Sequence, residues 1–410
     1  MILTILEYQK IFIGKNRNLS KNQITYEDAD AIRIIDINNK GIFKWGNRYI
    51  IPQQWIGIIS LAGLTIEILP KVSESYDIGV IKETLLYMFK TAHDIPIKKN
   101  VKAKVDFSKN GLIEILISNF LDKLESYIRE GFITKYCKVT RNLSAIKGSL
   151  NFSKQISKNL FNPTRFICKY SRLEVDNDIN QHIKFTLNRM VDISKDYSNN
   201  KRLKTSLNYF GDIKFIDDID NKKFKLHINR LNVRIRELID YCNLFQDGYS
   251  VNLSIGKNQV SSMLFDMNKV FEMFIYKSYK KIYGTVISYQ NTKNYLITNN
   301  KSGTKYINLR PDILINVSKG IKIVVDTKWK VVKGFAKETD VYQINAYVTA
   351  IPDVDTSVLI YPKTHLTNSV IGDYEFINPL RIKVLKIRAV DLSLVNDEVL
   401  FMKHLNDILA

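Results

Sequence analysis

The segment Leu309–Val331 constrains the fold most, because two strand-like runs flank a short turn in it. The turn formers Ser318–Gly320 make a three-residue loop, which is typical of a β-hairpin. A hairpin with this loop has a fixed register. That register places Asp312 directly opposite Asp326.

Side chains alternate between the two faces of a strand, so the register also sorts the hairpin into two faces. One face is apolar, and we expect it to be buried. Its three cross-strand pairs are Ile313 with Val325, Ile315 with Ile323, and Val317 with Ile321. The other face carries Asp312, Asp326 and Lys328.

Two opposed carboxylates and a lysine on one face suggest a metal site. Directly opposed residues have Cβ atoms roughly 4.5–5.5 Å apart, and carboxylates that close repel each other. A divalent cation relieves the repulsion, and oxygen ligands without Cys or His favour Mg²⁺ or Mn²⁺. The ammonium of Lys328 would then orient an attacking water or offset charge on a phosphate. The alternative is an ordinary surface hairpin with two Asp residues.

The dipeptide Pro311-Asp312, followed by Asp326-x-Lys328, resembles the PD-(D/E)xK nuclease motif. The similarity extends further. LRPDI and VVDTKWK, with LFDMNKVFE upstream at Leu264–Glu272, resemble the McrC family, the nuclease subunits of McrBC modification-dependent restriction systems. A D-x-K by itself occurs often by chance, so the interpretation depends on the register, the turn and the upstream block together.

The resemblance implies a Mg²⁺-dependent DNA endonuclease that hydrolyses phosphodiesters with metal-activated water. Asp312 and Asp326 would hold the ion, together with the backbone carbonyl of Thr327. Lys328 would position the nucleophile and stabilise the pentavalent phosphate.

Five further residues are candidates for supporting this site. Glu272 lies in a predicted helix, where such nucleases often place an acidic residue near the metal; it is otherwise a surface Glu. Gln343 and Tyr347 are four residues apart and share a helix face, and Q-x-x-x-Y resembles the RecB-like branch of the superfamily. Arg310 and Lys330 are candidates for DNA-backbone contacts by strand alternation.

The chain carries 61 Lys and Arg against 41 Asp and Glu, a net charge of +20. Such an excess favours polyanionic partners, since neutralising phosphates drives non-specific DNA affinity. A Lys-, Asn- and Ile-rich composition can also reflect a biased genome. The basic and aromatic stretch Lys154–Arg172 has two interpretations as well: nucleic-acid contact or a solvated strand.

Cysteine usage and hydropathy indicate a cytoplasmic protein. Cys137, Cys168 and Cys242 are far apart and lack C-x-x-C spacing, which predicts neither a zinc site nor disulfides. The amino terminus does not read as a signal peptide. No apolar run approaches the ~20 residues that span a bilayer. We therefore expect a soluble chain with no membrane partner.

Two other kinds of active site are disfavoured. The sequence contains no G-x-x-x-x-G-K-[ST], so it has no P-loop of its own for a nucleotide. Its five histidines are scattered and give neither a triad nor a zinc pattern. Histidine-based nucleases and metalloproteases are thereby disfavoured.

We expect a multi-domain α/β (α+β) chain in three successive parts. Residues 1–75 would be a β-rich, partner-docking domain, with a hairpin of Trp55–Leu61 and Leu64–Leu69. Residues 76–255 would be mainly helical. Residues 256–410 would be a PD-(D/E)xK, restriction-endonuclease-like domain.

Within the middle part, apolar spacing predicts helices at Ile78–Ala92 and Leu112–Gly131. Asp178 is the predicted N-cap of a third helix. The polar segment Asp196–Phe224 has few periodic apolar residues and is predicted to be a loop or insertion.

The resemblance also implies partners. In the McrC family an AAA+ GTPase, McrB, forms hexamers, recognises modified cytosine (5-methylcytosine) in double-stranded DNA and translocates it. The amino-terminal region of the nuclease subunit docks on this motor and stimulates its GTP hydrolysis, in defence against foreign DNA. One nuclease domain cuts one strand, so double-strand cleavage predicts that two copies meet. Two alternatives are a non-catalytic adaptor that activates the motor and a repair or recombination nuclease of the same fold.

Overall fold

The computed structural model contains ten α-helices and twenty β-strands within the residues it describes. Those residues are 1–36, 41–71, 77–96, 111–216, 232–255, 258–317, 320–332, 334–364, 366–377 and 382–409. No helix in these ranges is long and apolar enough to cross a membrane. The chain divides into two compact units, one of Met1–Leu116 with Asp247–Ala410 and one of Ile117–Gln246. The mixed α/β class is confirmed, whereas the three-part domain division stays a prediction.

The first unit contains a five-stranded sheet in the order β1-β7-β6-β12-β11. Its strands are β1 (Ile2–Leu6), β6 (Trp55–Leu61), β7 (Leu64–Leu69), β11 (Tyr249–Ile255) and β12 (Asn258–Asp266). The predicted hairpin of β6 and β7 is confirmed. It turns at Gly63, whose φ of +73° suits glycine. Because β12 pairs with β6, a strand distant in sequence completes this amino-terminal sheet.

A second, four-stranded sheet has the order β3-β2-β5-β4. Its strands are β2 (Ile11–Gly14), β3 (Gln23–Thr25), β4 (Phe43–Gly46) and β5 (Tyr49–Pro52). The helix α1 (Tyr26–Ile35) begins with a capping box, in which Thr25 and Asp28 each bond the other's backbone N–H. Residues of both sheets and of α1 share one core, largely of isoleucine and leucine.

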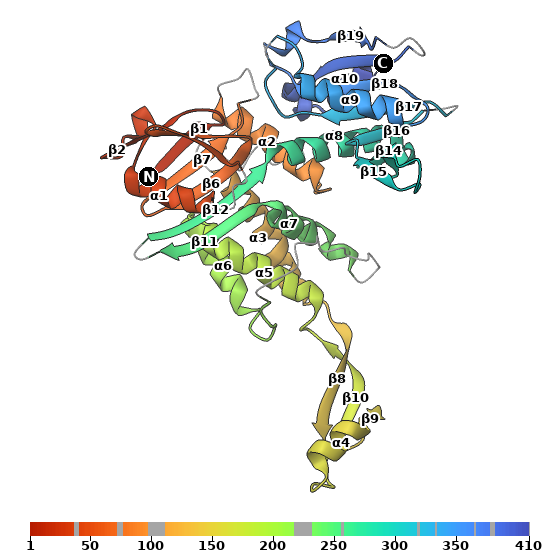
Figure 1. The fold of residues 1–410 in the computed structure, drawn as a ribbon. Coiled ribbons are helices and arrows are strands. Elements are labelled where there is room, and N and C mark those ends of the chain that lie inside the picture. The colour runs from red at the N-terminus through yellow and green to blue at the C-terminus, as the bar shows by residue number, and fades with distance from the viewer. Residues whose placement is uncertain are drawn as a thin grey trace. The chain divides into compact units, whose positions relative to one another are not determined.

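The predicted hairpin of Asp312 and Asp326 lies in a six-stranded sheet of the order β13-β16-β17-β18-β20-β19. Its strands are β13 (Ile287–Tyr289), β16 (Ile313–Asn316), β17 (Lys322–Thr327), β18 (Val354–Pro362), β19 (Gly372–Glu375) and β20 (Val384–Val390). The helices of this part of the unit are α8 (Met267–Tyr283), α9 (Glu338–Ala350) and α10 (Glu398–Leu409). The helix α2 (Ile78–Ala92), predicted with these bounds, packs against α8 (Figure 1).

The predicted register of β16 and β17 is confirmed. The observed partners include Ile313 with Val325 and Ile315 with Ile323. The predicted burial of the apolar face is confirmed for Ile313, Val325 and Ile315 and wrong for Val317 and Ile321. Leu314 and Val324 on the other face are also buried, because helices cover both sides of this sheet. Val317 and Ile321 are exposed, because they lie beyond the ends of both strands. The turn residues 318 and 319 fall outside the described residues.

Among its described residues, the second unit contains four long helices. They are α3 (Leu112–Glu130, assigned to this unit from Ile117), α5 (Asp178–Ile193), α6 (Tyr197–Asn208) and α7 (Arg236–Asp247). The prediction of a loop across Asp196–Phe224 is wrong for 197–208, which form α6. Only Asn199, Leu203 and Ser206 of α6 are buried, so its apolar periodicity is too weak to detect. Residues 217–224 lie outside the described residues.

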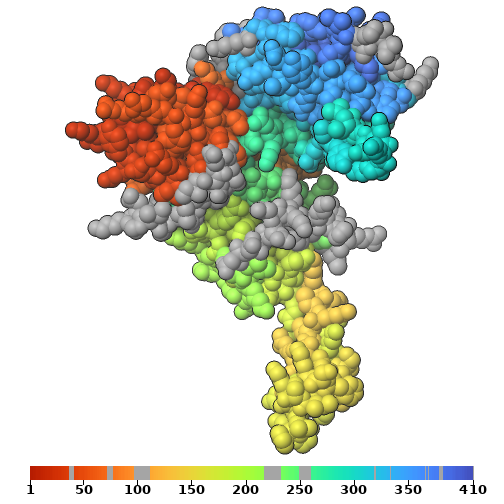
Figure 2. Space-filling view, viewed as in Figure 1, coloured from red at the N-terminus to blue at the C-terminus, as the bar shows by residue number. Residues whose placement is uncertain are grey.

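Between α3 and α5 the chain forms an arm, residues 135–174. It contains β8 (Lys135–Leu143), β9 (Ser149–Leu150), α4 (Phe152–Asn159) and β10 (Phe166–Glu174), with the strand order β8-β10-β9. The long strands extend away from α5 and α6 of the same unit (Figure 1). In Figure 2 the arm is the narrow yellow projection. The mainly helical middle region therefore includes a β-sheet, and the solvated-strand interpretation of Lys154–Arg172 holds for its part from Phe166, while 154–159 belong to α4.

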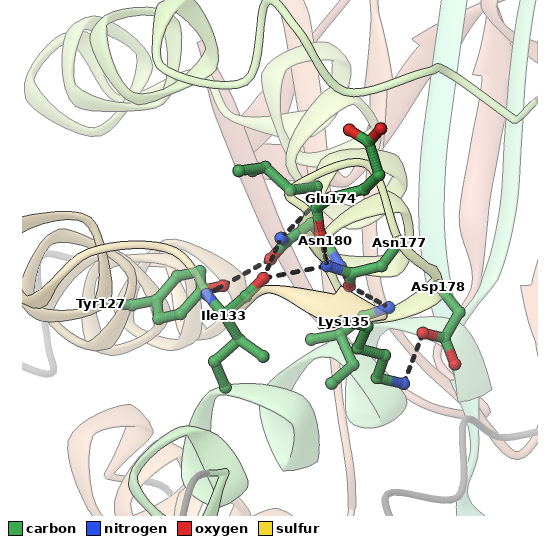
Figure 3. Close-up of polar contacts among 9 residues, drawn as sticks. Tyr127, Ile133, Lys135, Glu174, Asn177, Asp178 and Asn180 are labelled. Carbon is green, nitrogen blue, oxygen red and sulfur yellow. Dashed lines mark hydrogen bonds and ion pairs between the residues drawn. The ribbon is translucent and has the colours of Figure 1, made fainter. Parts of the chain in front are cut away.

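A buried polar network fixes the base of the arm (Figure 3). The side-chain amides of Asn177 and Asn180 donate to the carbonyl of Ile133 over 2.9 and 3.0 Å. The hydroxyl of Tyr127 donates to Oδ1 of Asn180 and accepts the N–H of Ile133. Oδ1 of Asn177 also caps α5, so the predicted cap at Asp178 is wrong by one residue.

Candidate active site

Strand pairing brings the predicted carboxylates together. Asp312 directly precedes β16, and Asp326 is the penultimate residue of β17. β17 is an interior strand, paired with β16 on one side and β18 on the other. The backbone that carries Asp326 is therefore hydrogen-bonded to a neighbouring strand on both sides. Lys328 is the first residue after β17.

The core of the site is an ion pair beside a second carboxylate. Nζ of Lys328 lies 2.5 Å from Oδ2 of Asp326, whose side chain is fully buried. The backbone N–H and the hydroxyl of Thr327 donate to Oδ2 of Asp312 over 2.8 and 2.9 Å. The structure thus brings together the Asp-Asp-Lys set that the sequence predicts.

Burial makes the charges of this site costly. Burial and, after it, the nearby charge of Asp312 raise the pKa of Asp326 to about 7, against the opposing effect of Lys328. Burial also raises the pKa of Asp312, although the bonds from Thr327 oppose it. Burial by itself would lower the pKa of Lys328, but the attraction of Asp326 raises it. The lysine stays charged while the carboxylates resist losing their protons.

The residues fit a divalent cation. Oδ1 of Asp326 is buried and accepts no hydrogen bond from any described residue, which leaves its desolvation uncompensated. Mg²⁺ is commonly held by one or two carboxylates, with water and substrate phosphates completing its shell. Among the described residues no group of three or more His, Cys, Asp or Glu that could hold a metal is found. The carbonyl of Thr327 remains a predicted ligand.

The predicted Q-x-x-x-Y pair lies at this site. Nζ of Lys328 donates to Oε1 of Gln343 over 2.9 Å. Nε2 of Gln343 donates to the hydroxyl of Tyr347 over 2.7 Å, and that hydroxyl donates to the carbonyl of Arg310 over 3.1 Å. One face of α9 is thereby connected to both the catalytic lysine candidate and the segment that leads into Asp312.

Gln290 is a site residue that the sequence did not indicate. Its Nε2 donates to Oε1 of Glu272 over 2.7 Å, and Arg310 donates to its Oε1 over 2.6 Å. Its backbone N–H donates to the carbonyl of Asp312 over 2.9 Å, and its φ is +43°. A single glutamine outside any motif gives no sequence signal.

Glu272 is half-buried on α8 and its pKa is raised by burial and then by the charge of Asp312. This proximity supports the predicted supporting role over the surface alternative. Arg310 is exposed, as a DNA-contacting residue requires. Lys330 forms an ion pair with the buried Asp340, which also accepts a hydrogen bond from Tyr361.

Trp329 connects the site to the amino-terminal sheet of the same unit. Its ring packs 5.3 Å from that of Phe271, the neighbour of Glu272 on α8. Its indole N–H donates to the carboxylate of Glu7 over 3.2 Å. Glu7 is fully buried, and burial raises its pKa to about 7.

Comparisons with known proteins add the following. A family model described as McrBC 5-methylcytosine restriction system component matches residues 50–362. The fold is similar to a chain of the tetradecameric assembly of Thermococcus gammatolerans McrB AAA+ hexamers with bound McrC, at 19% identity and a TM-score of 0.61 over 100% of both chains. A chain of the Thermococcus gammatolerans McrBC complex is 20% identical, with a TM-score of 0.47 over 68% of this chain and 86% of that one. No curated protein matches.

Proposed function

Because the chain belongs to the family of McrBC 5-methylcytosine restriction system components, we propose that it is the Mg²⁺-dependent endonuclease subunit of such a system. The ion pair of Lys328 with the buried Asp326, beside Asp312, carries the proposal. Buried like charges with raised pKa values cost folding free energy. Such clusters gather at functional sites, and a surface hairpin gains nothing from one.

The fold supports the same assignment. A mixed sheet with the hairpin β16–β17 near its centre, flanked by α8 and α9, fits a PD-(D/E)xK, restriction-endonuclease-like domain. In that arrangement Glu272 enters from α8 and Gln343 from α9. The site is thus assembled from one hairpin and two helices.

We assign the chemical roles by position. Asp312 and Asp326 hold the cation, which when bound supplies Lewis acidity and lowers the pKa of water. Lys328 orients the attacking water and offsets charge that develops on the phosphate. Gln343 restrains the ammonium of Lys328 through their 2.9 Å hydrogen bond. Glu272 and Tyr347 support the site from outside the reacting atoms.

The proposed partner is a McrB-like AAA+ GTPase hexamer, and the proposed substrate is double-stranded DNA that carries modified cytosine. The family supports both. One site cuts one strand, so two copies of the chain would act together on a duplex.

Plasmid cleavage tests this function. Wild type and Asp326→Ala are compared with Mg²⁺, with and without the AAA+ partner and GTP, on methylated and unmethylated DNA. We expect cutting only with the partner, GTP and methylation, and a loss of at least 1000-fold, or roughly 4 kcal/mol of barrier, in Asp326→Ala. Asp355→Ala, at an exposed aspartate of β18, is the matched control.

The outcomes separate the alternatives. Persistent cutting by Asp326→Ala would show that the site is assigned wrongly. A wild type that never cuts, yet still raises the partner's GTP hydrolysis, would be the motor-activating adaptor. Cutting without any nucleotide requirement would indicate a repair or recombination nuclease.

A further inference from the structure

The strands β14 (Asn294–Thr298) and β15 (Lys305–Leu309) form a two-stranded sheet of their own. Every residue from 295 to 308 is exposed, on both faces of this hairpin. Isolated two-stranded hairpins are marginally stable in water. In Figure 2 the cyan lobe is this hairpin, at the edge of the blue part of the same unit. Most of the hairpin surface is therefore open to solvent.

The hairpin combines positive charge with exposed aromatic rings. Between positions 291 and 311 the sequence has no Asp or Glu, and its cations are Lys293, Lys301, Lys305 and Arg310. Tyr295 and Tyr306 are exposed. Nζ of Lys305 lies 5.8 Å from the ring centre of Tyr295. Cations interleaved with aromatic rings are typical of surfaces that bind nucleic acid.

The hairpin is anchored next to the candidate active site. β15 ends at Leu309, three residues before Asp312, and three residues span at most about 11 Å. β14 packs against α9, the helix of Gln343 and Tyr347. Tyr347 also bonds the carbonyl of Arg310 over 3.1 Å. The base of the hairpin thus lies within a few nucleotides of the phosphate to be cut.

Two features of the hairpin backbone, its tip and the residue Ile307, keep its side chains exposed. Oδ1 of Asn299 accepts the N–H groups of Lys301 and Ser302 over 2.9 and 3.0 Å, which orders the turn at the tip. Ile307 has a φ of +57°, a costly conformation for a β-branched residue. Its side chain is 59% exposed, so packing within the chain does not offset the cost of this backbone conformation.

We propose that this hairpin is the surface that holds double-stranded DNA beside the cleavage site. Lys293, Lys301 and Lys305 contact the phosphate backbone, while Tyr295 and Tyr306 contact sugars and bases. The inference rests on the proposed nuclease function and assigns its substrate-binding element. Charge complementarity identifies DNA as the occupant, since a second copy of this chain carries the same positive charge.

DNA binding by the full chain tests the inference. A fluorescent duplex is titrated in EDTA, which prevents cutting, at salt concentrations of roughly 50 to 200 mM. The hairpin variant combines Lys293→Gln, Lys301→Gln and Lys305→Gln. Its matched control combines Lys15→Gln, Lys21→Gln and Lys403→Gln, exposed lysines elsewhere in the same unit.

The hairpin variant should bind at least about tenfold more weakly, with a salt slope lower by about 1 per lysine. The control should keep most of the wild-type affinity. A second variant, Tyr295→Ala with Tyr306→Ala, should lose affinity severalfold without a change in slope, because stacking releases no counterions. Its melting temperature should stay within a few degrees of wild type, since both rings are exposed.

Equal DNA binding by the hairpin variant and its control overturns the inference. So does a loss of self-association in sedimentation with DNA binding unchanged, which would make a second copy the occupant. If wild type cuts DNA and the hairpin variant binds and cuts normally, only this inference fails. If wild type binds DNA through the hairpin but never cuts, the nuclease function fails and the binding surface stands.

Discussion

Single side chains at the candidate site depend on one another for their charge. Asp326 is fully buried, and the neighbouring charge of Asp312 makes its ionisation harder still. Lys328 offsets part of this cost at 2.5 Å. Gln290 does the same for Glu272, since its amide donates to that half-buried carboxylate. Removing Lys328 or Gln290 therefore leaves a carboxylate with less compensation for its charge.

Gln290→Ala should reduce cleavage about 10- to 100-fold, the usual cost of losing a residue that orients a site. The variant removes one of the hydrogen-bond donors to Glu272 and an acceptor for Arg310. Cleavage rate with Mg²⁺ and the AAA+ partner is the measurement. Thr292→Ala, an exposed neighbour, should cut at the wild-type rate. Normal cutting by Gln290→Ala would show that this bridge is dispensable.

Individual elements differ in how they are held. The candidate active site lies on an interior strand, β17, with hydrogen bonds on both sides. The hairpin β14–β15 and the arm have few neighbours. The arm depends on its base, where buried amides satisfy the backbone between α3 and β8. A buried polar group that loses its partner costs more than the bond itself.

Asn180→Leu should lower the free energy of unfolding by about 2–4 kcal/mol, because the hydroxyl of Tyr127 and the carbonyl of Val175 lose a partner. Urea denaturation measures this loss, and hydrogen exchange in β8 and β10 should accelerate. Asp178→Ala removes the exposed ion pair with Lys135 and should cost under about 1 kcal/mol. Similar losses of stability in the two variants would contradict a stabilising role of the buried polar network at the base of the arm.

For the molecule as a whole, the amino-terminal segment and the segment of the candidate active site belong to one unit. β12 joins the amino-terminal sheet and leads directly into α8. Glu7, just after β1, accepts the indole N–H of Trp329, the residue after Lys328. Changes in the amino-terminal sheet can therefore reach the strand that carries the site.

The pH dependence of stability should report Glu7. Its pKa is raised from 4.5 to about 7 by burial, so the folded state holds a proton that the unfolded state has lost. This contribution is fully present below pH 4.5 and is lost as pH rises to 7. It amounts to at most about 3 kcal/mol. Glu7→Gln should make the loss between pH 5 and 8 smaller, as urea denaturation at the two pH values would show, while the contribution of Asp326, whose pKa is also raised to about 7, remains.

An exposed residue of the same unit provides the comparison. Glu27→Gln should leave the pH dependence of the wild type unchanged. If Glu7→Gln loses stability between pH 5 and 8 as steeply as wild type does, another group is responsible.

The sequence correctly predicted the features that depend on residues close together in the chain. The bounds of α2 and of the hairpin β6–β7 follow from apolar periodicity and a glycine turn, and the register of β16 with β17 follows from a short loop. Sequence analysis missed the features that depend on contacts between residues far apart in the chain. α6 looked like a loop because only three of its residues are buried, and it packs against α5. The cap of α5 was placed at Asp178, although Oδ1 of Asn177 accepts the first N–H groups of the helix while its amide donates to carbonyls at the base of the arm.

By itself the sequence determined the Asp312, Asp326 and Lys328 set, because the turn fixes which residues face each other across a hairpin. Tertiary structure decided that both faces of that hairpin are buried, since helices cover both sides of the sheet. It also decided that Gln290 bridges Glu272 and Arg310 and that Trp329 contacts Glu7. Those contacts join residues far apart in the chain, and only packing in three dimensions brings them within hydrogen-bonding distance.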